Sequence, residues 1–182
     1  MSKTLFSAEN STFSQNAHTF AQTQIYPLLW PGQSVTMVDA TITREASGLI
    51  EGKLDGQMGI DRVAIVSTNG LKQPIKYTIQ ERFRKDSFKR WGDITITEWN
   101  FSSNTPSEIY KIQADLFVYA FFDSCDSIFK EVVVVYVPVL KAAISNGTIR
   151  YVIRTNPRSN QTFMGISIAD LERVGAIMYL SI

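Results

Sequence analysis

The chain has 182 residues, of which 45% are hydrophobic and 19% are charged, a composition that excludes a disordered protein and is enough for one domain with a hydrophobic core. Its net charge of +1 excludes a bulk attraction to nucleic acid or to membrane, so that polyanion binding would need a local basic patch. One cysteine excludes an intramolecular disulfide, and together with one histidine it leaves too few ligands for a Cys/His zinc site. We therefore treat 1–182 as a single domain, and we expect a cytoplasmic protein because a lone thiol suits a reducing compartment.

Neither a leader peptide nor a membrane anchor is expected from the apolar segments of the sequence. The first residues lack the apolar core that a signal peptide has after its basic start. No stretch approaches the roughly 20 apolar residues that cross a bilayer. The longest apolar run, 132–140, is short and β-branched, so it predicts a buried strand.

The first expected element is a helix at 13–28. Apolar residues recur there at three- and four-residue spacing, which is typical of an amphipathic helix, and Pro31–Gly32 ends it. The helix carries no Asp or Glu. His18 lies near Gln15 and Gln22 in its middle, and we interpret it as a polar surface residue.

Three strands are expected next, at 35–43, 62–67 and 75–84. Asn69–Gly70 predicts a tight turn between the second and the third of them. The third strand alternates between an apolar and a polar face, although Glu81 interrupts the apolar face near its end. The apolar side chains of this strand are Ile75, Tyr77, Ile79 and Phe83.

The rest of the chain predicts further strands and short helices. The expected strands lie at 93–99, 115–122, 130–137 and 149–154, and the expected helices at 107–113, 139–145 and 167–174. Ser167 and Asp170 form a capping box that would begin the last helix. Glu108 and Lys111 are expected to be a surface pair. This order predicts an α+β (mixed α/β) fold with a central mixed sheet flanked by helices.

A candidate catalytic site lies on the second and third of the expected strands. Asp61 opens one strand, and Gln80 and Arg82 lie two residues apart on the next, so that both leave the same face. Mg²⁺ prefers oxygen ligands, of which the protein commonly supplies one or two. Asp61 would be the charged ligand, the Gln80 amide oxygen a neutral one, and Arg82 would stabilise the charge that develops on a phosphoryl group. The glycines that precede Asp61 would let the backbone come close to a ligand.

These residues resemble the motifs of the PD-(D/E)XK, or restriction-endonuclease-like, nuclease superfamily. GID (59–61) matches the first motif, and IQERF (79–83) matches the second, with Gln80-x-Arg82 in place of Glu-x-Lys. The resemblance implies an αβββαβ core and hydrolysis of phosphodiester bonds in DNA that depends on Mg²⁺ or Mn²⁺. It also implies a homodimer as one form of assembly. The chain departs from the motif because Gln80 carries no carboxylate and Arg82 stays protonated and cannot act as a base.

Other interpretations of the same residues stay open. A catalytically inactive nucleic-acid-binding or assembly module on the same fold would fit the missing carboxylate. Alternatively, Gln80 and Arg82 form the solvated face of a half-exposed strand, and Asp61 only ends a turn after Gly59. In the nuclease interpretation, Glu51 and Asp55 are candidates for a supporting acid.

A basic stretch follows the candidate site. Residues 82–91 carry five basic side chains against Asp86, with aromatic residues between them. Basic side chains suit phosphates and aromatic rings suit stacked bases, so this stretch predicts contact with nucleic acid. The residues expected to bind the backbone are Arg84, Lys85, Lys89 and Arg90. We expect Phe83 and Trp91 to pack on the core.

Overall fold

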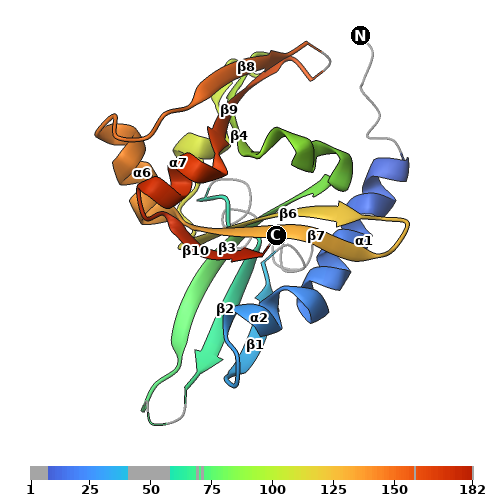
Figure 1. Ribbon diagram of the computed structural model, residues 1–182, viewed down its shortest axis with the longest axis vertical. Coiled ribbons are helices and arrows are strands. Elements are labelled where there is room, and N and C mark those ends of the chain that lie inside the picture. Colours follow the sequence, from blue (N-terminus) through green and yellow to red (C-terminus); the bar gives the residue numbers. More distant parts are fainter. Residues whose placement is uncertain (1–7, 41–57, 69, 71, 158, 182) are drawn as a thin grey trace.

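The protein is described by a computed structural model that covers residues 8–40, 58–68, 70, 72–157 and 159–181. Its elements are α1 (Ala8–Gln24), α2 (Tyr26–Leu29), β1 (Ser34–Asp39), β2 (Arg62–Ser67), β3 (Ile75–Lys85), the 3₁₀ helix η1 (Asp86–Trp91), β4 (Asp93–Asn100), β5 (Thr105–Pro106), α5 (Glu108–Lys111), β6 (Leu116–Asp123), β7 (Ile128–Tyr136), α6 (Val137–Ser145), β8 (Val152–Asn156), β9 (Gln161–Ser167), α7 (Ile168–Arg173) and β10 (Ile177–Ser181). The α+β class is therefore as predicted (Figure 1).

Two sheets organise the described residues. One is a mixed six-stranded sheet in the order β1-β2-β3-β6-β7-β10, and the other is an antiparallel four-stranded sheet in the order β5-β4-β9-β8. In the larger sheet, β2 pairs antiparallel with both β1 and β3, whereas β3 pairs parallel with β6. The parallel pair requires a crossover, and the chain makes it through η1, β4, β5 and α5.

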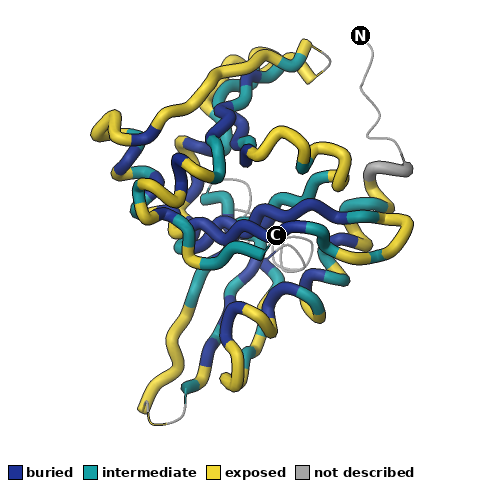
Figure 2. Tube along the Cα trace, viewed as in Figure 1, coloured by how far each residue is buried: buried dark blue, intermediate teal, exposed yellow. Residues whose placement is uncertain are grey.

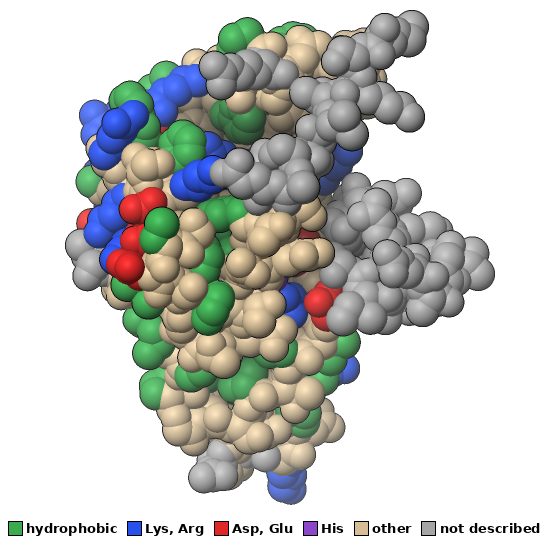
Figure 3. All heavy atoms as spheres, turned by 90° about the vertical axis from the view of Figure 1, so that its right-hand side faces the viewer, with side chains coloured by type: hydrophobic (Ala, Val, Ile, Leu, Met, Phe, Trp, Pro, Cys, Tyr) green, Lys and Arg blue, Asp and Glu red, His purple; other side chains and the backbone are tan. Residues whose placement is uncertain are grey.

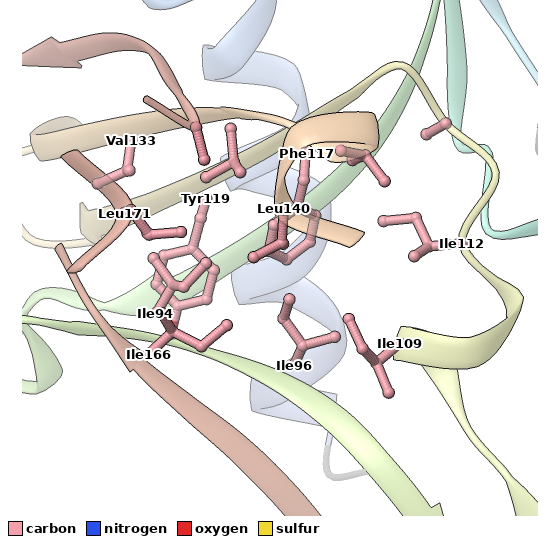
Figure 4. Close-up of a cluster of buried hydrophobic side chains, with 14 of the residues drawn as sticks. Ile94, Ile96, Ile109, Ile112, Phe117, Tyr119, Val133, Leu140, Ile166 and Leu171 are labelled. Carbon is pink, nitrogen blue, oxygen red and sulfur yellow. The ribbon is translucent and has the colours of Figure 1, made fainter. Parts of the chain in front are cut away.

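The two faces of the six-stranded sheet are covered by different parts of the chain. On one face, Ala21 and Ile25 of the N-terminal helical segment pack with Ile79 and Val118 of the sheet. On the other face, the four-stranded sheet and the helices α5, α6 and α7 enclose a second apolar cluster (Figure 4). Its members include Ile94, Ile96, Ile109, Phe117, Tyr119, Leu140, Ile166 and Leu171. Figure 2 shows the result, with the buried residues concentrated along β6 and β7 at the centre of the molecule.

Burial on both faces explains the composition of β6. All of its side chains from Leu116 to Phe122 are buried, so the strand has a continuous apolar run with no alternation. The apolar run at 132–140 contains the end of a buried strand and the start of a helix, in agreement with the expected strand at 130–137 and the expected helix at 139–145. β7 ends at Tyr136 and α6 begins at Val137, because Pro138 lacks a backbone N–H and suits the first turn of a helix.

Other expectations differ from the structure in detail. The strand at 62–67 is confirmed, and so is the cap of α7, where the Asp170 N–H donates to Ser167 Oγ at 3.0 Å. The expected helix at 13–28 is divided into α1 and α2 just before Pro27. The strands β9 and β10 were not predicted. In the part of the chain that the structure describes, no helix is long and apolar enough to span a membrane.

Candidate functional site

A polar cleft of about 780 Å³ lies between α1 and the strands β1, β2 and β3. The strands contribute Asp39, Asp61, Arg62, Gln80 and Glu81 to its lining. The wall formed by α1 consists of amide and hydroxyl side chains together with His18. Figure 3, which views the side of the molecule on which α1 lies in Figure 1, shows a face whose middle is mostly uncharged. Apart from His18, the charged and ionisable side chains of the cleft belong to the strands and to Asp61, the residue just before β2.

The structure brings Asp61 and Gln80 together, as predicted. Gln80 Nε2 donates a hydrogen bond to Asp61 Oδ2 over 2.8 Å, and the backbone N–H of Glu81 donates to the same oxygen over 2.7 Å. The backbone N–H of Asp61 in turn donates to the carbonyl of Ile79 at 2.8 Å. Hydrogen bonds from β3 thus hold both the carboxylate and the backbone of Asp61.

The other end of the Gln80 amide accepts no hydrogen bond within the part of the chain that the structure describes. Because the Asp61 carboxylate accepts hydrogen bonds, the amide nitrogen faces it, and the amide oxygen points the other way. Gln80 Oε1 is buried and accepts no hydrogen bond from the described residues. A buried acceptor of this kind costs about 1–3 kcal/mol if nothing binds it. For this oxygen and the Asp61 carboxylate to share one cation, the Gln80 amide would have to turn and give up its hydrogen bond to Asp61.

Gly59 leaves the space that this oxygen occupies. Its backbone has φ +58°, which L side chains adopt with strain, and a Cβ built on it would lie 3.0 Å from Gln80 Oε1. The glycines before Asp61 were expected to let a ligand come close, whereas in the structure the group close to Gly59 is the Gln80 side chain.

Arg82 does not join the cleft. Its Nη2 hydrogen-bonds to the carboxylate of Glu108 in α5 and to Thr97 Oγ1, the latter at 3.2 Å. The Glu108 carboxylate also accepts from the backbone N–H of Thr97. The interpretation of Glu108 as a surface partner of Lys111 is therefore wrong, because Glu108 is held between β3 and β4 and neutralises Arg82. The sequence correctly placed Arg82 and Gln80 on the same face of β3. It could not show which acid would pair with Arg82.

A buried ionic cluster, formed by His18, Tyr26, Arg62 and Glu81, borders the cleft on its α1 side; we call it the Glu81 cluster. The Glu81 side chain is fully buried, and both of its oxygens accept from Arg62 Nε at 3.0 Å. Tyr26 donates its hydroxyl to Glu81 Oε1, and His18 Nδ1 lies 2.6 Å from Oε2. The interpretation of His18 as a plain surface residue is therefore wrong.

The sequence contained a signal for this cluster. Glu81 interrupts an apolar face of β3, and His18 lies in α1 between Ala17 and Ala21, both of which are buried. A polar residue on each of two apolar surfaces that face each other indicates a buried pair.

Both ionisable partners of Glu81 in the helical segment have a shifted pKa. Burial by itself lowers the pKa of His18, but the hydrogen bond and the charge of Glu81 outweigh it, so the pKa is raised above its ordinary value. Burial raises the pKa of Tyr26 well above its ordinary value, and the charge of Glu81 raises it further. Tyr26 therefore stays protonated and donates its hydroxyl at every pH of interest.

The basic stretch lies on η1 and its flanks. The guanidinium of Arg84 lies 4.7 Å from the ring centroid of Phe88, and that of Arg90 lies 5.3 Å from the ring of Trp91. Trp91 is 58% exposed, so the expectation that it packs on the core is wrong. Lys85 is exposed, and Lys89 Nζ lies 3.6 Å from Glu131 Oε2. Phe83 does pack against the core, as expected. The stretch thus presents cations and aromatic rings side by side on the surface.

The proposed supporting acids Glu51 and Asp55 lie outside the described residues. Within the described ranges, no three His, Cys, Asp or Glu side chains are grouped so that they could hold a metal ion by themselves. Among the described residues of the cleft, Asp61 and the Gln80 amide oxygen are the metal ligands predicted from the sequence.

Comparisons of the chain with protein-family models, with curated proteins and with solved structures found no match. The resemblance to the PD-(D/E)XK superfamily therefore stays a prediction from two short motifs. The functional argument rests on the geometry of the cleft.

Proposed function

We propose that the protein is a metal-dependent nuclease that hydrolyses phosphodiester bonds in DNA. The order of its elements supports this proposal. A helix (α1) precedes three antiparallel strands (β1, β2 and β3), and a short helix (α5) precedes a strand (β6) that is parallel to the third. This order agrees with the αβββαβ core that the motif resemblance implies, apart from α2 before β1 and the elements η1, β4 and β5 between β3 and α5.

The observation that carries the proposal is the Gln80 amide held against the Asp61 carboxylate, with an oxygen that accepts no hydrogen bond from the described residues. Mg²⁺ and Mn²⁺ bind carboxylate and carbonyl oxygens, and Mg²⁺ usually keeps several waters and substrate oxygens among its ligands. The residues present therefore fit such an ion, which Asp61 and Gln80 would hold. When bound, the ion would polarise a phosphoryl oxygen and lower the pKa of a water molecule.

The remaining residues of the site would position the Asp61 carboxylate and the nucleic acid. The Glu81 N–H and the Gln80 amide hold the Asp61 carboxylate in one orientation. The amide and hydroxyl side chains of α1 offer hydrogen-bond donors to a phosphate or a base. The cations of the basic stretch, Arg84, Lys85, Lys89 and Arg90, would hold the nucleic-acid backbone at a distance from the scissile bond.

A second candidate is a catalytically inactive module that binds nucleic acid. The pairing of Arg82 with Glu108 favours it, because a guanidinium neutralised in this way cannot stabilise the charge on a phosphoryl group. In the nuclease proposal, catalysis therefore takes place in the cleft. Arg82 would contact the phosphate only if a bound substrate displaced Glu108.

The two candidates differ in a plasmid-nicking assay. Purified protein is incubated with supercoiled plasmid and Mg²⁺, Mn²⁺ or EDTA, and the wild type is compared with Asp61→Asn. We expect nicking with either metal, none in EDTA, and a loss of about 100-fold or more in the variant, since a metal contributes several kcal/mol to the transition state. Asp126→Asn is the matched control: it removes an exposed carboxylate that pairs with Lys130 and should cleave at the wild-type rate.

Two results would reject the proposal. Equal cleavage by Asp61→Asn and the wild type would mean that the site around Asp61 takes no part in the reaction. No cleavage by the wild type, with salt-dependent DNA binding retained in EDTA, would establish the inactive module instead.

A further inference from the structure

The inference concerns His18 and its place in the Glu81 cluster. Ala17 and Ala21 flank it on the buried side of α1, and their small side chains let the helix lie against β3. His18 Nδ1 lies 2.6 Å from Glu81 Oε2, and the ring meets Phe83 edge-on with centroids 5.0 Å apart. The side chain is still 35% exposed and lines the cleft. Because Nδ1 faces the buried carboxylate, the exposed edge of the ring is the one that carries Nε2.

Glu81 determines which nitrogen of the neutral ring carries the proton. A carboxylate that takes hydrogen bonds from Arg62 Nε and from the Tyr26 hydroxyl is an acceptor, so the atom that faces it at His18 is a donor. The proton of neutral His18 therefore lies on Nδ1. The lone pair then lies on Nε2, in a residue that lines the same cleft as Asp61 and Gln80.

The cleft needs a base that the motif does not supply. Arg82 stays protonated and is paired with Glu108. Among the other ionisable groups of the lining, Asp39 lies 3.5 Å from Arg62, and Glu81 is fully buried within its cluster. Asp61 has the role of a metal ligand in the proposed function. His18 is the group whose lone pair is directed by a neighbour and whose ring reaches the cleft.

We propose that His18 is the general base of the reaction and that Glu81 positions it, an inference that rests on the proposed nuclease function. A water molecule attacks phosphorus, and its proton passes to His18 Nε2 as the new P–O bond forms. The bond from phosphorus to the leaving oxygen breaks, its electron pair stays on that oxygen, and solvent supplies the proton that makes it a hydroxyl. The imidazolium then returns its proton to solvent, which restores neutral His18.

The ionisation of His18 determines the pH at which it can play this role. Burial lowers its pKa, and the hydrogen bond from the ring to Glu81 and the charge of Glu81 raise it by more. The charge of Asp61 also raises it, and that of Arg62 lowers it. Because the raised pKa favours the protonated ring, His18 can accept a proton only where the pH is high enough to leave it neutral, and the cleavage rate should rise with pH through that pKa.

A first test needs neither metal nor substrate. Since the chain has one histidine, NMR of the ¹⁵N-labelled protein shows its ring nitrogens without ambiguity. We expect the neutral form to carry its proton on Nδ1, with a pKa above the ordinary value. A neutral ring protonated on Nε2 would overturn the inference, because Nε2 would then have no lone pair to accept the proton of water.

The second test is cleavage by His18→Ala. We expect a loss of about 10²–10⁴-fold in the rate of plasmid nicking, part of which added imidazole restores, while Mn²⁺ affinity stays within about twofold of wild type. Thr23→Ala is the matched control, an exposed position on the same helix, and should cleave at the wild-type rate.

The outcomes separate the two proposals. If the wild type cleaves and Asp61→Asn does not, but His18→Ala keeps the full rate, only the role of His18 fails. A loss that imidazole does not restore, with Mn²⁺ affinity intact, also rejects the base and leaves the metal site standing. A wild type that does not cleave in the presence of metal rejects the nuclease and the base together.

Discussion

Replacing Arg62 by methionine would remove the positive charge at the centre of the Glu81 cluster. The Arg62 side chain is only 6% exposed, and its Nε donates to both oxygens of a carboxylate that is fully buried. Methionine fills a similar volume but leaves the charge of Glu81 without its strongest partner. Breaking a buried ion pair from one side costs about 3–5 kcal/mol, because the remaining charge is buried and uncompensated.

Circular dichroism measures this loss in two ways: unfolding in urea gives the free energy, and thermal unfolding gives Tm. For a chain of this size, 1 kcal/mol corresponds to a change of about 2–4 °C in Tm, so we expect Arg62→Met to lower Tm by roughly 6–20 °C. Arg173→Met is the control. Arg173 also pairs with an acid, Asp170, but its side chain is 50% exposed, and exposed pairs contribute about 0–1 kcal/mol.

A double-mutant cycle separates the ion pair from the loss of packing. Glu81→Gln in the Arg62→Met background should cost less than Glu81→Gln in the wild type, because the unpaired charge has already lost its partner. The reasoning is refuted if Arg62→Met stays within about 1 kcal/mol of wild type, or if the two substitutions are strictly additive.

Two further predictions concern Gln80. Gly59→Ala and Gly147→Ala both place a side chain at positive φ, which costs about 1–2 kcal/mol, but only the first puts a Cβ 3.0 Å from Gln80 Oε1. In urea unfolding, we expect Gly59→Ala to lower the free energy of unfolding by roughly 1.5–3 kcal/mol more than Gly147→Ala does, because moving Gln80 breaks its hydrogen bond to the Asp61 carboxylate. Equal losses in the two variants would contradict this. Gln80→Glu restores a second carboxylate and should tighten Mn²⁺ binding about tenfold or more in calorimetry, whereas Gln73→Glu, which adds the same charge at an exposed position, should not. An unchanged affinity in Gln80→Glu would mean that its side chain does not face the ion.

Local features of the sequence were enough to predict much of the sheet. The alternation in β3, the continuous apolar run of β6, and the capping residues Ser167 and Asp170 each depend on neighbours within a few positions. The contact between Asp61 and Gln80 was predictable for the same reason, because it joins two strands that are consecutive and adjacent.

Contacts across long separations in the chain could not be predicted in this way. His18 meets Glu81 across 63 positions, and the acid that neutralises Arg82 lies 26 positions further along. Which residues pair in this way depends on how the helices pack against the sheet. The spacing of polar and apolar residues within one element does not give that information. β9 was missed because Gly165 interrupts its pattern. That glycine is needed where Asp93 approaches, since a Cβ there would lie 3.2 Å from Asp93 Oδ2.

The central claim is that Asp61 and the Gln80 amide oxygen share a divalent cation. A crystal soaked in Mn²⁺ and measured at a wavelength where manganese scatters anomalously tests it directly. The account predicts one anomalous peak within bonding distance of an Asp61 carboxylate oxygen and of Gln80 Oε1, with the Gln80 amide turned so that its oxygen, and not its nitrogen, faces the ion. Strong manganese density elsewhere in the molecule, with none in this cleft, would contradict it.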